Sequence, residues 1–359
     1  VVQMAGLKAY EIGGTIHIVV NNQVGFTTNY IDARTSTYCT DVAKTTQCPV
    51  FHVNGDDAEA VAYTVKLAMD YRQMSGKDVW VDILCYRKHG HNEGDEPKFT
   101  QPTLYKAIAA HADPREIYTQ KLIDSGVEGA REMAQEMEQS FSAMLDDRLN
   151  EAKQVRVGKI TNFMEERWKG FKRAEEKDFL KSPQTGVKKE TLQLIGEKLS
   201  ALHPDGKKFF SKLEKILGDR KKMMEAGVLD WSMGELLAYG SLLLEGHPVR
   251  FTGQDVERGT FSHRHAVVKV EDSEEEFIHL KHIKEDQALL QIYNSLLSEY
   301  AVLGFEYGYA LAMPNSLTIW EAQFGDFVNG AQIVLDQYLC CADEKWGTQN
   351  GIVLLLPHG

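Results

Sequence analysis

The stretch Asn21-Asn22-Gln23-Val24-Gly25-Phe26 places two amides and a glycine turn directly after an apolar, β-branched run. Amide oxygens and backbone carbonyls are hard, neutral ligands that suit Mg²⁺ or Ca²⁺, especially when a diphosphate completes the coordination shell. Asn22 could offer its side chain and Val24 its carbonyl oxygen. The spacing is therefore consistent with a metal site, and an ordinary turn that begins with Asn-Asn is the alternative.

A second stretch, residues 86–97, is rich in groups that bind phosphate. His89 and His91 alternate with glycines, and Arg87 and Lys88 precede them. Such a loop at the carboxyl end of a strand is suited to holding phosphate oxygens. A charged surface turn is the alternative. Because this loop and the Asn-Asn turn would open on the same edge of one sheet, a ligand with a metal and phosphates could satisfy both.

Three further stretches in the second half of the chain carry candidate residues. The loop 254–265 is long and rich in Arg and His, so His263 and His265 are candidates for holding a substrate carboxylate, with a solvated surface loop as the alternative. Glu299 lies at the start of a glycine-punctuated helix, where an acid also simply favours the helix dipole. Phe324 and Phe327 follow the strand 317–321, where a flat ring could stack.

The elements that position these residues indicate parallel sheets. The run 15–20 has the pattern of a central strand buried on both faces. A strand at 49–53, a helix at 58–72 after an Asp cap and a strand at 78–85 follow at the spacing of βαβ units. The sequence thus predicts an α/β fold with doubly wound, mostly parallel sheets.

The middle of the chain has a different texture, with charged helical patterns such as 130–154 and 187–202. The segment 172–185, with charge clusters, Ser-Pro and Gly, is the best linker candidate. Ser232 to Glu235 has the form of a capping box before an apolar helix at 236–244, and strands are expected at 249–253, 317–321 and 352–356. We predict domains at 1–155 and 226–359, joined by a helical linker at 156–225.

Composition limits the function classes. The formal charge of −12 argues against nonspecific nucleic-acid binding, and no apolar run is long enough to span a membrane. The five cysteines have neither a CxxC pair nor metal-ligand spacing, which points to scattered thiols in a reducing compartment, either a bacterial cytoplasm or the mitochondrial matrix. We expect an excised piece, because the sequence starts without Met and stops after a buried-looking strand.

Together these stretches resemble the thiamine-diphosphate 2-oxoacid dehydrogenases, and most of all the decarboxylating component of the 2-oxoglutarate dehydrogenase complex. The resemblance rests on residues 21–28, the His-Gly-His-Asn-Glu loop, the Leu-Leu-Ser-Glu segment 296–299 and the segment 321–327. It covers nearly the whole chain and is weakest between about 115 and 225. The family's cofactor motif begins with a Gly-Asp pair well before Asn-Asn, and only the Asn-Asn half lies in this sequence.

The resemblance implies specific roles. Asn22 and the Val24 carbonyl would bind Mg²⁺, and His91 would lie near the diphosphate of thiamine diphosphate. In the second domain the cofactor-binding residues would be Glu299 on the aminopyrimidine, Phe324 or Phe327 against its ring and Leu297 as an apolar prop. Glu299 and His91 would be the catalytic residues, and His263 and His265 would bind substrate.

The implied reaction is oxidative decarboxylation of 2-oxoglutarate with succinyl transfer to a lipoyl group of a partner enzyme, a succinyltransferase. A buried carboxyl on the pyrimidine would favour the tautomer that removes the thiazolium proton. A homodimer is also implied. The alternatives are a 2-oxoadipate-preferring relative, a transketolase, or a fragment that binds no cofactor. A nicotinamide dehydrogenase is disfavoured because no Gly-x-Gly-x-x-Gly follows a strand.

Overall fold

The computed structural model describes residues 2–155, 157–158 and 161–358. The chain divides into two compact units, residues 1–159 and 160–359, and each is described by itself. The predicted domain limits at 155 and 225 stay predictions. The second unit includes the helices of the predicted linker, since two of them pack into its core.

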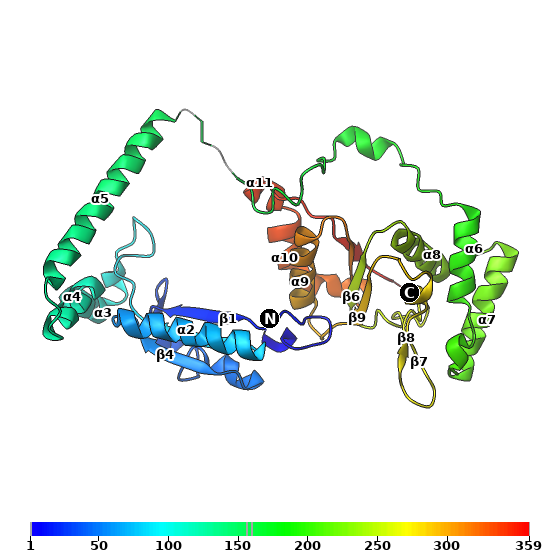
Figure 1. Ribbon diagram of the computed structural model, residues 1–359, viewed down its shortest axis with the longest axis horizontal. Coiled ribbons are helices and arrows are strands. Elements are labelled where there is room, and N and C mark those ends of the chain that lie inside the picture. The colour runs from blue at the N-terminus through cyan, green and yellow to red at the C-terminus, as the bar shows by residue number, and fades with distance from the viewer. Residues whose placement is uncertain (1, 156, 159–160, 359) are drawn as a thin grey trace. The chain divides into compact units, whose positions relative to one another are not determined.

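Unit 1 is built on a three-stranded parallel sheet with the order β1-β5-β4. Among the described residues, its other elements are a short hairpin, β2-β3, five α-helices, of which Figure 1 labels α2 to α5, and three 3-10 helices. The bounds are β1 Ile16–Asn21, β2 Val24–Gly25, β3 Thr28–Asn29, α1 Tyr30–Ala33, β4 Val50–Asn54, α2 Ala58–Ser75, β5 Val79–Leu84, α3 Pro102–Ala110, α4 Pro114–Asp124 and α5 Ala130–Gln154.

Helix α2 covers one face of this sheet. Asp57 caps it by accepting from the Ala60 backbone N–H, and Gly76 ends it in the left-handed conformation. Ala68 packs there against Val79 and Val81 of β5. The strand–helix–strand unit predicted from 49–85 is therefore confirmed.

The prediction that the first strand is central and buried on both faces is wrong for the part of the chain that the structure describes. β1 lies at an edge of the sheet and pairs with β5 alone. Ile18 and Val20 are 51% and 67% exposed, because α2 packs mainly over β4 and β5. A continuous β-branched run thus identified the strand but not its place in the sheet.

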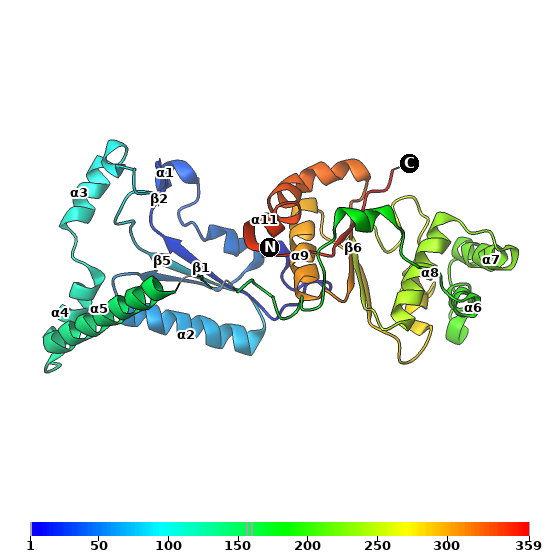
Figure 2. The same ribbon diagram turned by 90° about the horizontal axis from the view of Figure 1, so that it is seen from above.

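Unit 2 holds a four-stranded parallel sheet with the order β11-β10-β6-β9 (Figure 2). The bounds of its strands and larger helices are α6 Lys189–Leu199, α7 Ser211–Ala226, α8 Trp231–Leu244, β6 Val249–Gly253, β7 Val268–Lys269, β8 Glu276–Phe277, β9 Leu290–Asn294, α9 Glu299–Ala312, β10 Leu317–Glu321, α10 Gln332–Val334, α11 Ala342–Trp346 and β11 Val353–Leu355. The 3-10 helix η7, Gly325–Ala331, follows β10.

Helices cover both faces of this second sheet. On one face Phe251 and Ile319 pack with residues of α6 and α8, and on the other Trp320 packs with Val302 of α9 and Val334 of α10. Alternate residues of β10 therefore enter different cores, as the pleat of a strand requires. Unit 2 has the predicted doubly wound α/β architecture.

The predicted capping box at Ser232 is wrong. Helix α8 begins two residues earlier than such a box implies, at Trp231, and Asp230 is its N-cap, with a side-chain oxygen that accepts from the Met233 backbone N–H at 2.7 Å. Ser232 instead donates its hydroxyl proton to the His263 carbonyl oxygen at 2.7 Å. This hydrogen bond joins the start of α8 to the loop 254–265.

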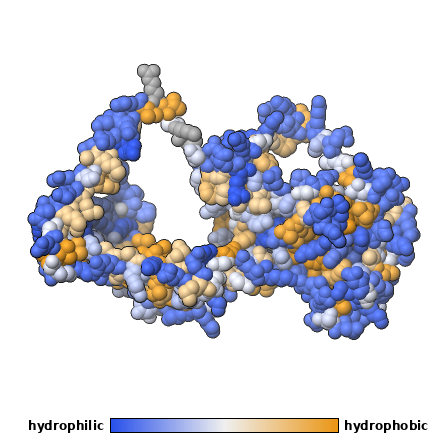
Figure 3. Space-filling view, in the orientation of Figure 1, coloured by the Kyte–Doolittle hydropathy of each residue, from blue (hydrophilic) through white to orange (hydrophobic). Residues whose placement is uncertain are grey.

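Apolar side chains also lie on the surface of unit 1, over α2 and at intervals along α5 (Figure 3). On α5, Met137 and Phe141 are 67% and 59% exposed. Among the described residues no helix is long and apolar enough to cross a membrane. All five cysteines are described, and each is free of disulfide bonds.

Candidate active site

The candidate residues of unit 2 gather at one edge of its sheet because three strands end in register. Gly253 of β6 pairs with Asn294 of β9 on one side and with Glu321 of β10 on the other. The loops that follow these strands carry Gln254, Glu299 and Gln323. In an open parallel sheet this carboxyl edge is where ligands bind.

Glu299 is the first residue of α9 and is half-buried, and Ser298 caps the helix. Its Oε1 accepts from Gln254 Nε2 at 2.9 Å and from the Gln323 backbone N–H at 3.4 Å. The sequence suggests no obvious partner for this acid, but two neutral donors hold it. Neither is a cation, so no positive charge stabilises the ionised form.

Burial is the main influence on this carboxyl. Desolvation raises the pKa of Glu299 above its ordinary value, and the hydrogen bonds from Gln323 and Gln254 oppose it without cancelling it. A carboxyl with a raised pKa keeps its proton nearer to neutral pH. Such a group can donate a proton to a ligand or share one with it.

The segment after β10 carries aromatic side chains and packs against the helix that Glu299 begins. Helix η7, which carries Phe327, packs against α9, and a Cβ atom added to its Gly330 would lie 3.9 Å from Glu299 Cβ. Phe324 is the N-cap residue of this helix, and its ring centroid is 5.9 Å from that of Phe261. Phe327 is 50% exposed. An exposed ring on a segment that packs against the helix of a half-buried acid is suited to a flat heterocycle with a hydrogen-bonding edge.

Leu297 and the loop residues complete this description of unit 2. Leu297 is 85% exposed, two residues before Glu299. His263 lines a cavity of about 480 Å³ together with Phe261 and His358. His263 Nδ1 is buried and has no hydrogen-bond partner in the described part of the chain, and a Cβ atom added at Gly259 would lie 2.5 Å from it.

Burial lowers the pKa of both His263 and His265, which favours neutral imidazoles. The positive charge of Arg264 also lowers the pKa of His263. His265 Nε2 lies 2.9 Å from the Ser262 carbonyl oxygen. A substrate carboxylate here would therefore be met by neutral hydrogen-bond donors.

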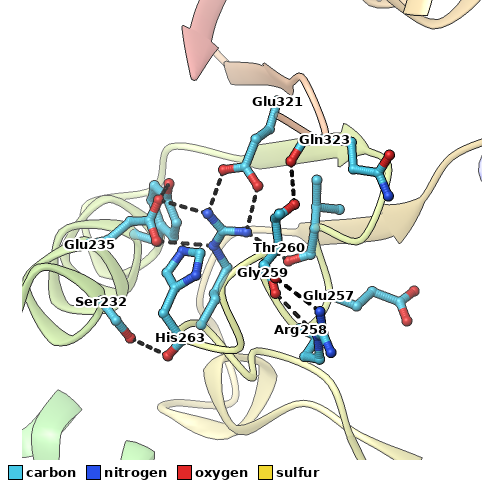
Figure 4. A network of polar contacts seen from close by, with 12 residues as sticks. Ser232, Glu235, Glu257, Arg258, Gly259, Thr260, His263, Glu321 and Gln323 are labelled. Atoms are coloured by element: carbon cyan, nitrogen blue, oxygen red, sulfur yellow. Dashed lines mark hydrogen bonds and ion pairs between the residues drawn. The ribbon is translucent and has the colours of Figure 1, made fainter. Parts of the chain in front are cut away.

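Arg264, between the two histidines, is a buried structural cation. Its side chain is 1% exposed and forms ion pairs with Glu235 of α8 and Glu321 of β10, two residues that Figure 4 labels. Arg264 Nε donates to Glu235 at 3.0 Å, and Nη1 donates to Glu321 at 3.0 Å. With both carboxylates already in place, the guanidinium is occupied, and its task is to fix the loop on the sheet.

The same loop is joined to the Glu299 segment through Gln323. Thr260 Oγ1 donates to the Gln323 carbonyl oxygen (Figure 4), while the Gln323 backbone N–H donates to Glu299. Gln323 Nε2 also donates to Asp255 Oδ2 at 2.8 Å. The loop with the candidate substrate residues and the candidate acid therefore form one hydrogen-bonded assembly.

In unit 1 the Asn-Asn turn is a compact polar corner at the end of β1. Asn22 Oδ1 accepts from the Val24 backbone N–H at 3.3 Å, and Gln23 has a positive φ of 67°. Gln23 Nε2 donates to the Cys85 carbonyl oxygen at 2.9 Å, just after β5. Both the amide oxygen of Asn22 and the carbonyl of Val24 are neutral oxygen donors of the kind that Mg²⁺ accepts.

The prediction that the second loop meets this turn is confirmed within unit 1. The ring of His91 lies 4.6 Å from that of Phe26, centroid to centroid, and Arg87 Nη2 donates to the Phe26 carbonyl oxygen at 3.0 Å. The His91 backbone N–H donates to Asp95 Oδ2 at 2.8 Å. His91 is exposed, so its ring is accessible to a ligand at this edge.

These residues fit, in part, the thiamine diphosphate and Mg²⁺ that the sequence implied. The described residues contain no cluster of three or more His, Cys, Asp or Glu side chains that could bind a metal by themselves. Asn22 and Val24 could supply two oxygens of a shell that a diphosphate helps to complete. Glu299, together with Phe324 or Phe327, fits an aminopyrimidine ring in unit 2.

Comparison with known proteins agrees with this geometry. Residues 1–161 match the family described as dehydrogenase E1 component, and residues 228–359 match the transketolase pyrimidine binding domain. The chain is 44% identical over 357 residues to the 2-oxoglutarate dehydrogenase E1 components of Brucella anthropi, Brucella ovis and Brucella canis. The chain is thus similar to dehydrogenase E1 components over nearly its whole length.

These alignments cover 99% of the chain and 35% of each relative. The chain thus spans about a third of the length of the curated relatives it matches. The two family matches fall on the two parallel sheets, one in each unit.

Sequence reasoning missed the residues that hold the family's candidate acid. The sequence marks Gln254 and Gln323 only as parts of loops, and Glu235 only as part of a helix cap. One signal is present for the glutamines, because each lies one or two residues beyond a predicted strand, at the edge where ligands bind. The partnership of Arg264 with Glu235 and Glu321 has no local sequence signal.

Proposed function

We propose that the chain is part of a thiamine-diphosphate-dependent 2-oxoglutarate dehydrogenase E1 component. The reaction would be oxidative decarboxylation of 2-oxoglutarate, with transfer of the succinyl group to a lipoyl group of a partner succinyltransferase. The observation that carries the proposal is Glu299, a half-buried acid with a raised pKa and neutral partners, at the start of the helix against which η7 packs.

The cofactor, when bound, supplies a thiazolium carbon that adds to the substrate ketone and takes up the electrons released with carbon dioxide. The residues of this chain would bind and orient it and handle protons. Glu299 would hydrogen-bond the aminopyrimidine, with Phe324 or Phe327 against the ring and Leu297 as an apolar prop. A carboxyl whose pKa is raised by burial can share its proton with a ring nitrogen near neutral pH.

In unit 1, Asn22 and the Val24 carbonyl would bind Mg²⁺. His91 would lie near the diphosphate and serve as a catalytic residue. Two neutral oxygens give a weak site alone, so the charge of the diphosphate would supply most of the attraction for the cation. Because the diphosphate supplies the charge and the protein supplies neutral oxygens, we expect metal and cofactor to bind together.

His263 and His265 would bind the substrate carboxylate. Their lowered pKa values keep them neutral, which suits hydrogen bonding more than charge pairing. The place of His263 in the lining of a cavity supports a ligand-binding role. The cavity beside His263 is large enough for a dicarboxylic acid.

The proposal includes a homodimer and a reducing compartment. In the family that the chain resembles, the two sheet domains that meet a cofactor come from different subunits, and we propose the same arrangement here. A 2-oxoadipate-preferring dehydrogenase is the nearest alternative, because His263 and His265 would accept the carboxylate of either acid. Carbon dioxide release from a panel of 2-oxoacids separates the two.

The substitution Glu299→Gln in the intact enzyme tests the proposal. Glutamine keeps the size and the hydrogen-bonding capacity but cannot carry a transferable proton. We expect proton exchange at the reactive carbon of the cofactor and decarboxylation of 2-oxoglutarate to fall roughly 10²- to 10⁴-fold, while cofactor affinity weakens little. Hydrogen–deuterium exchange of the bound cofactor measures the first quantity.

Glu190→Gln is the matched control, because Glu190 is an exposed acid in the first turn of α6. If Glu299 only favours its helix, both variants lose about 0.3–1 kcal/mol of stability and keep near-normal turnover. Exchange at the native rate in Glu299→Gln would refute the catalytic assignment.

A further inference from the structure

The hydrogen bonds to Glu299 are unequally divided between its two oxygens. Both donors, Gln254 Nε2 and the Gln323 N–H, reach Oε1. Among the described residues, none has a hydrogen bond to Oε2. We propose that Gln254 is a positioning residue for Glu299, whose amide occupies Oε1 and so directs the proton of the carboxyl to Oε2. The inference rests on the proposed function of Glu299.

The chemistry follows from the donors. An oxygen that accepts two N–H groups has its lone pairs engaged and cannot also carry the acid proton. The proton of the neutral acid is therefore placed on Oε2, the atom left for a ligand. A carboxyl without Gln254 could rotate and present either oxygen, and only one arrangement would be productive.

The backbone fixes Gln254 in this position. Gly253 has a φ of 152°, and a Cβ atom there would lie 2.2 Å from the Glu321 carbonyl oxygen. The Ser295 N–H donates to the Gly253 carbonyl oxygen at 2.8 Å, which ties the same peptide to the end of β9. Gln254 thus leaves a rigid corner between two strands.

The charged groups near the start of α9 are occupied elsewhere. On β6, Arg250 is paired with Glu306 of α9, and on β10 Glu321 is paired with Arg264. Asp255 bonds Gln323 Nε2, and Asp326 of η7 lies 3.9 Å from His358. Burial and the two hydrogen bonds are the causes of the Glu299 pKa shift, so a change at Gln254 acts on a carboxyl without a charged partner.

Gln254→Leu in the intact enzyme tests the inference. Leucine keeps a similar volume but donates no hydrogen bond. Because that bond lowers the pKa of Glu299, its loss raises the pKa further, and the carboxyl stays protonated to higher pH. Infrared difference spectra of cofactor-free protein show the protonated carboxyl directly, with Glu299→Gln identifying the band.

A second readout is proton exchange at the cofactor's reactive carbon. We expect Gln254→Leu to slow it roughly 10- to 100-fold, the effect of one hydrogen bond to an ionisable group. Gln254→Glu is the conservative partner variant. Its two neighbouring carboxyls would share one proton, so exchange should be retained at low pH and lost as the pH rises.

Gln332→Leu is the matched control. Gln332 Nε2 donates to Asp336 Oδ1 at 2.7 Å on the exposed surface of α10, so the same bond type is removed. We expect an unchanged infrared titration and native exchange. An unshifted Glu299 band in Gln254→Leu would overturn the inference even if Glu299 is catalytic.

The two proposals fail separately. If Gln254→Leu raises the pKa of Glu299 but Glu299→Gln exchanges the proton of the cofactor's reactive carbon at the native rate, the proposed function is wrong. The contact between Gln254 and Glu299 is then only structural. Both proposals are supported if Gln254→Leu raises the pKa of Glu299 and slows proton exchange, and if exchange in Gln254→Glu depends on pH.

Discussion

Removing the guanidinium of Arg264 should destabilise unit 2 more than any exposed substitution in the same loop. Arg264→Met keeps an unbranched side chain of similar length but leaves Glu235 and Glu321 facing each other without the cation. The Glu321 side chain is 2% exposed and that of Glu235 is 11% exposed. Uncompensated carboxylates at such depth make the free energy of unfolding fall.

The magnitude follows from the interactions that the guanidinium makes. Arg264 donates to both carboxylates and to the Val256 carbonyl oxygen at 2.9 Å, and its guanidinium lies 4.5 Å from the centroid of the Phe251 ring. Breaking a buried ion pair from one side costs about 3–5 kcal/mol. We expect a decrease of that size in the free energy of unfolding for Arg264→Met.

The decrease should depend on pH. Burial raises the pKa of Glu321 and the bonds to Arg264 lower it, so removing Arg264 raises that pKa further. A carboxyl whose folded-state pKa lies above its unfolded value stabilises the fold below the unfolded value, and the contribution is lost as pH rises through the folded value. The deficit of Arg264→Met should therefore be larger at pH 8 than at pH 5.

Urea denaturation of the whole chain, combined with hydrogen-exchange mass spectrometry of peptides from α8 and β10, measures the effect in unit 2. Arg258→Met is the control, since Arg258 is exposed and donates only to backbone carbonyls of its own loop. We expect it to change stability by less than about 0.5 kcal/mol. Adding Glu321→Gln to Arg264→Met should restore part of the stability. Equal stability of the two arginine variants would refute this reasoning.

Two predictions concern unit 1 in the intact enzyme. Asn22→Ala should weaken Mg²⁺-dependent cofactor binding without altering the fold, because it removes one of two neutral oxygens. Calorimetry with thiamine diphosphate at several Mg²⁺ concentrations measures this binding. An unchanged dependence on Mg²⁺ would exclude Asn22 as a metal ligand. His91→Ala should raise the cofactor concentration needed for half-maximal activity more than it raises the Michaelis constant for 2-oxoglutarate. Steady-state kinetics in which cofactor and substrate are each varied measure these two constants. An equal rise in both constants would contradict a role at the diphosphate.

Most elements of both sheets could be predicted from the sequence because their signals are local. The strand at 249–253 and the helix at 130–154 have the predicted bounds, since β-branched runs and helical spacing act within a few residues. The edge position of β1 could not be predicted, because strand order depends on pairings distant in sequence. Likewise, Asp230 competed with Ser232 for one helix start, and both are good caps.

The candidate site was partly predictable for the same reason. Glu299 and His91 lie in stretches whose residue types suggest chemistry, and the turn at Asn22 lies beside the His91 loop as expected. The partners of Glu299 come from residues 45 and 24 positions away. Such contacts are set by the register of three strand ends, which no single stretch of sequence contains.

Gly253 also bears on how this chain can vary over generations. Any other residue at position 253 adds a Cβ atom 2.2 Å from a carbonyl oxygen of β10 and needs a backbone conformation that L-amino acids rarely adopt. The clash cannot be relieved by a side chain, because its other partner is the backbone of a paired strand. Every missense mutation of this codon is therefore expected to disturb the loop holding Arg264 and the contact to Glu299 at once. Substitutions that persist in this part of the fold should therefore occur at the residues around Gly253 and not at Gly253 itself.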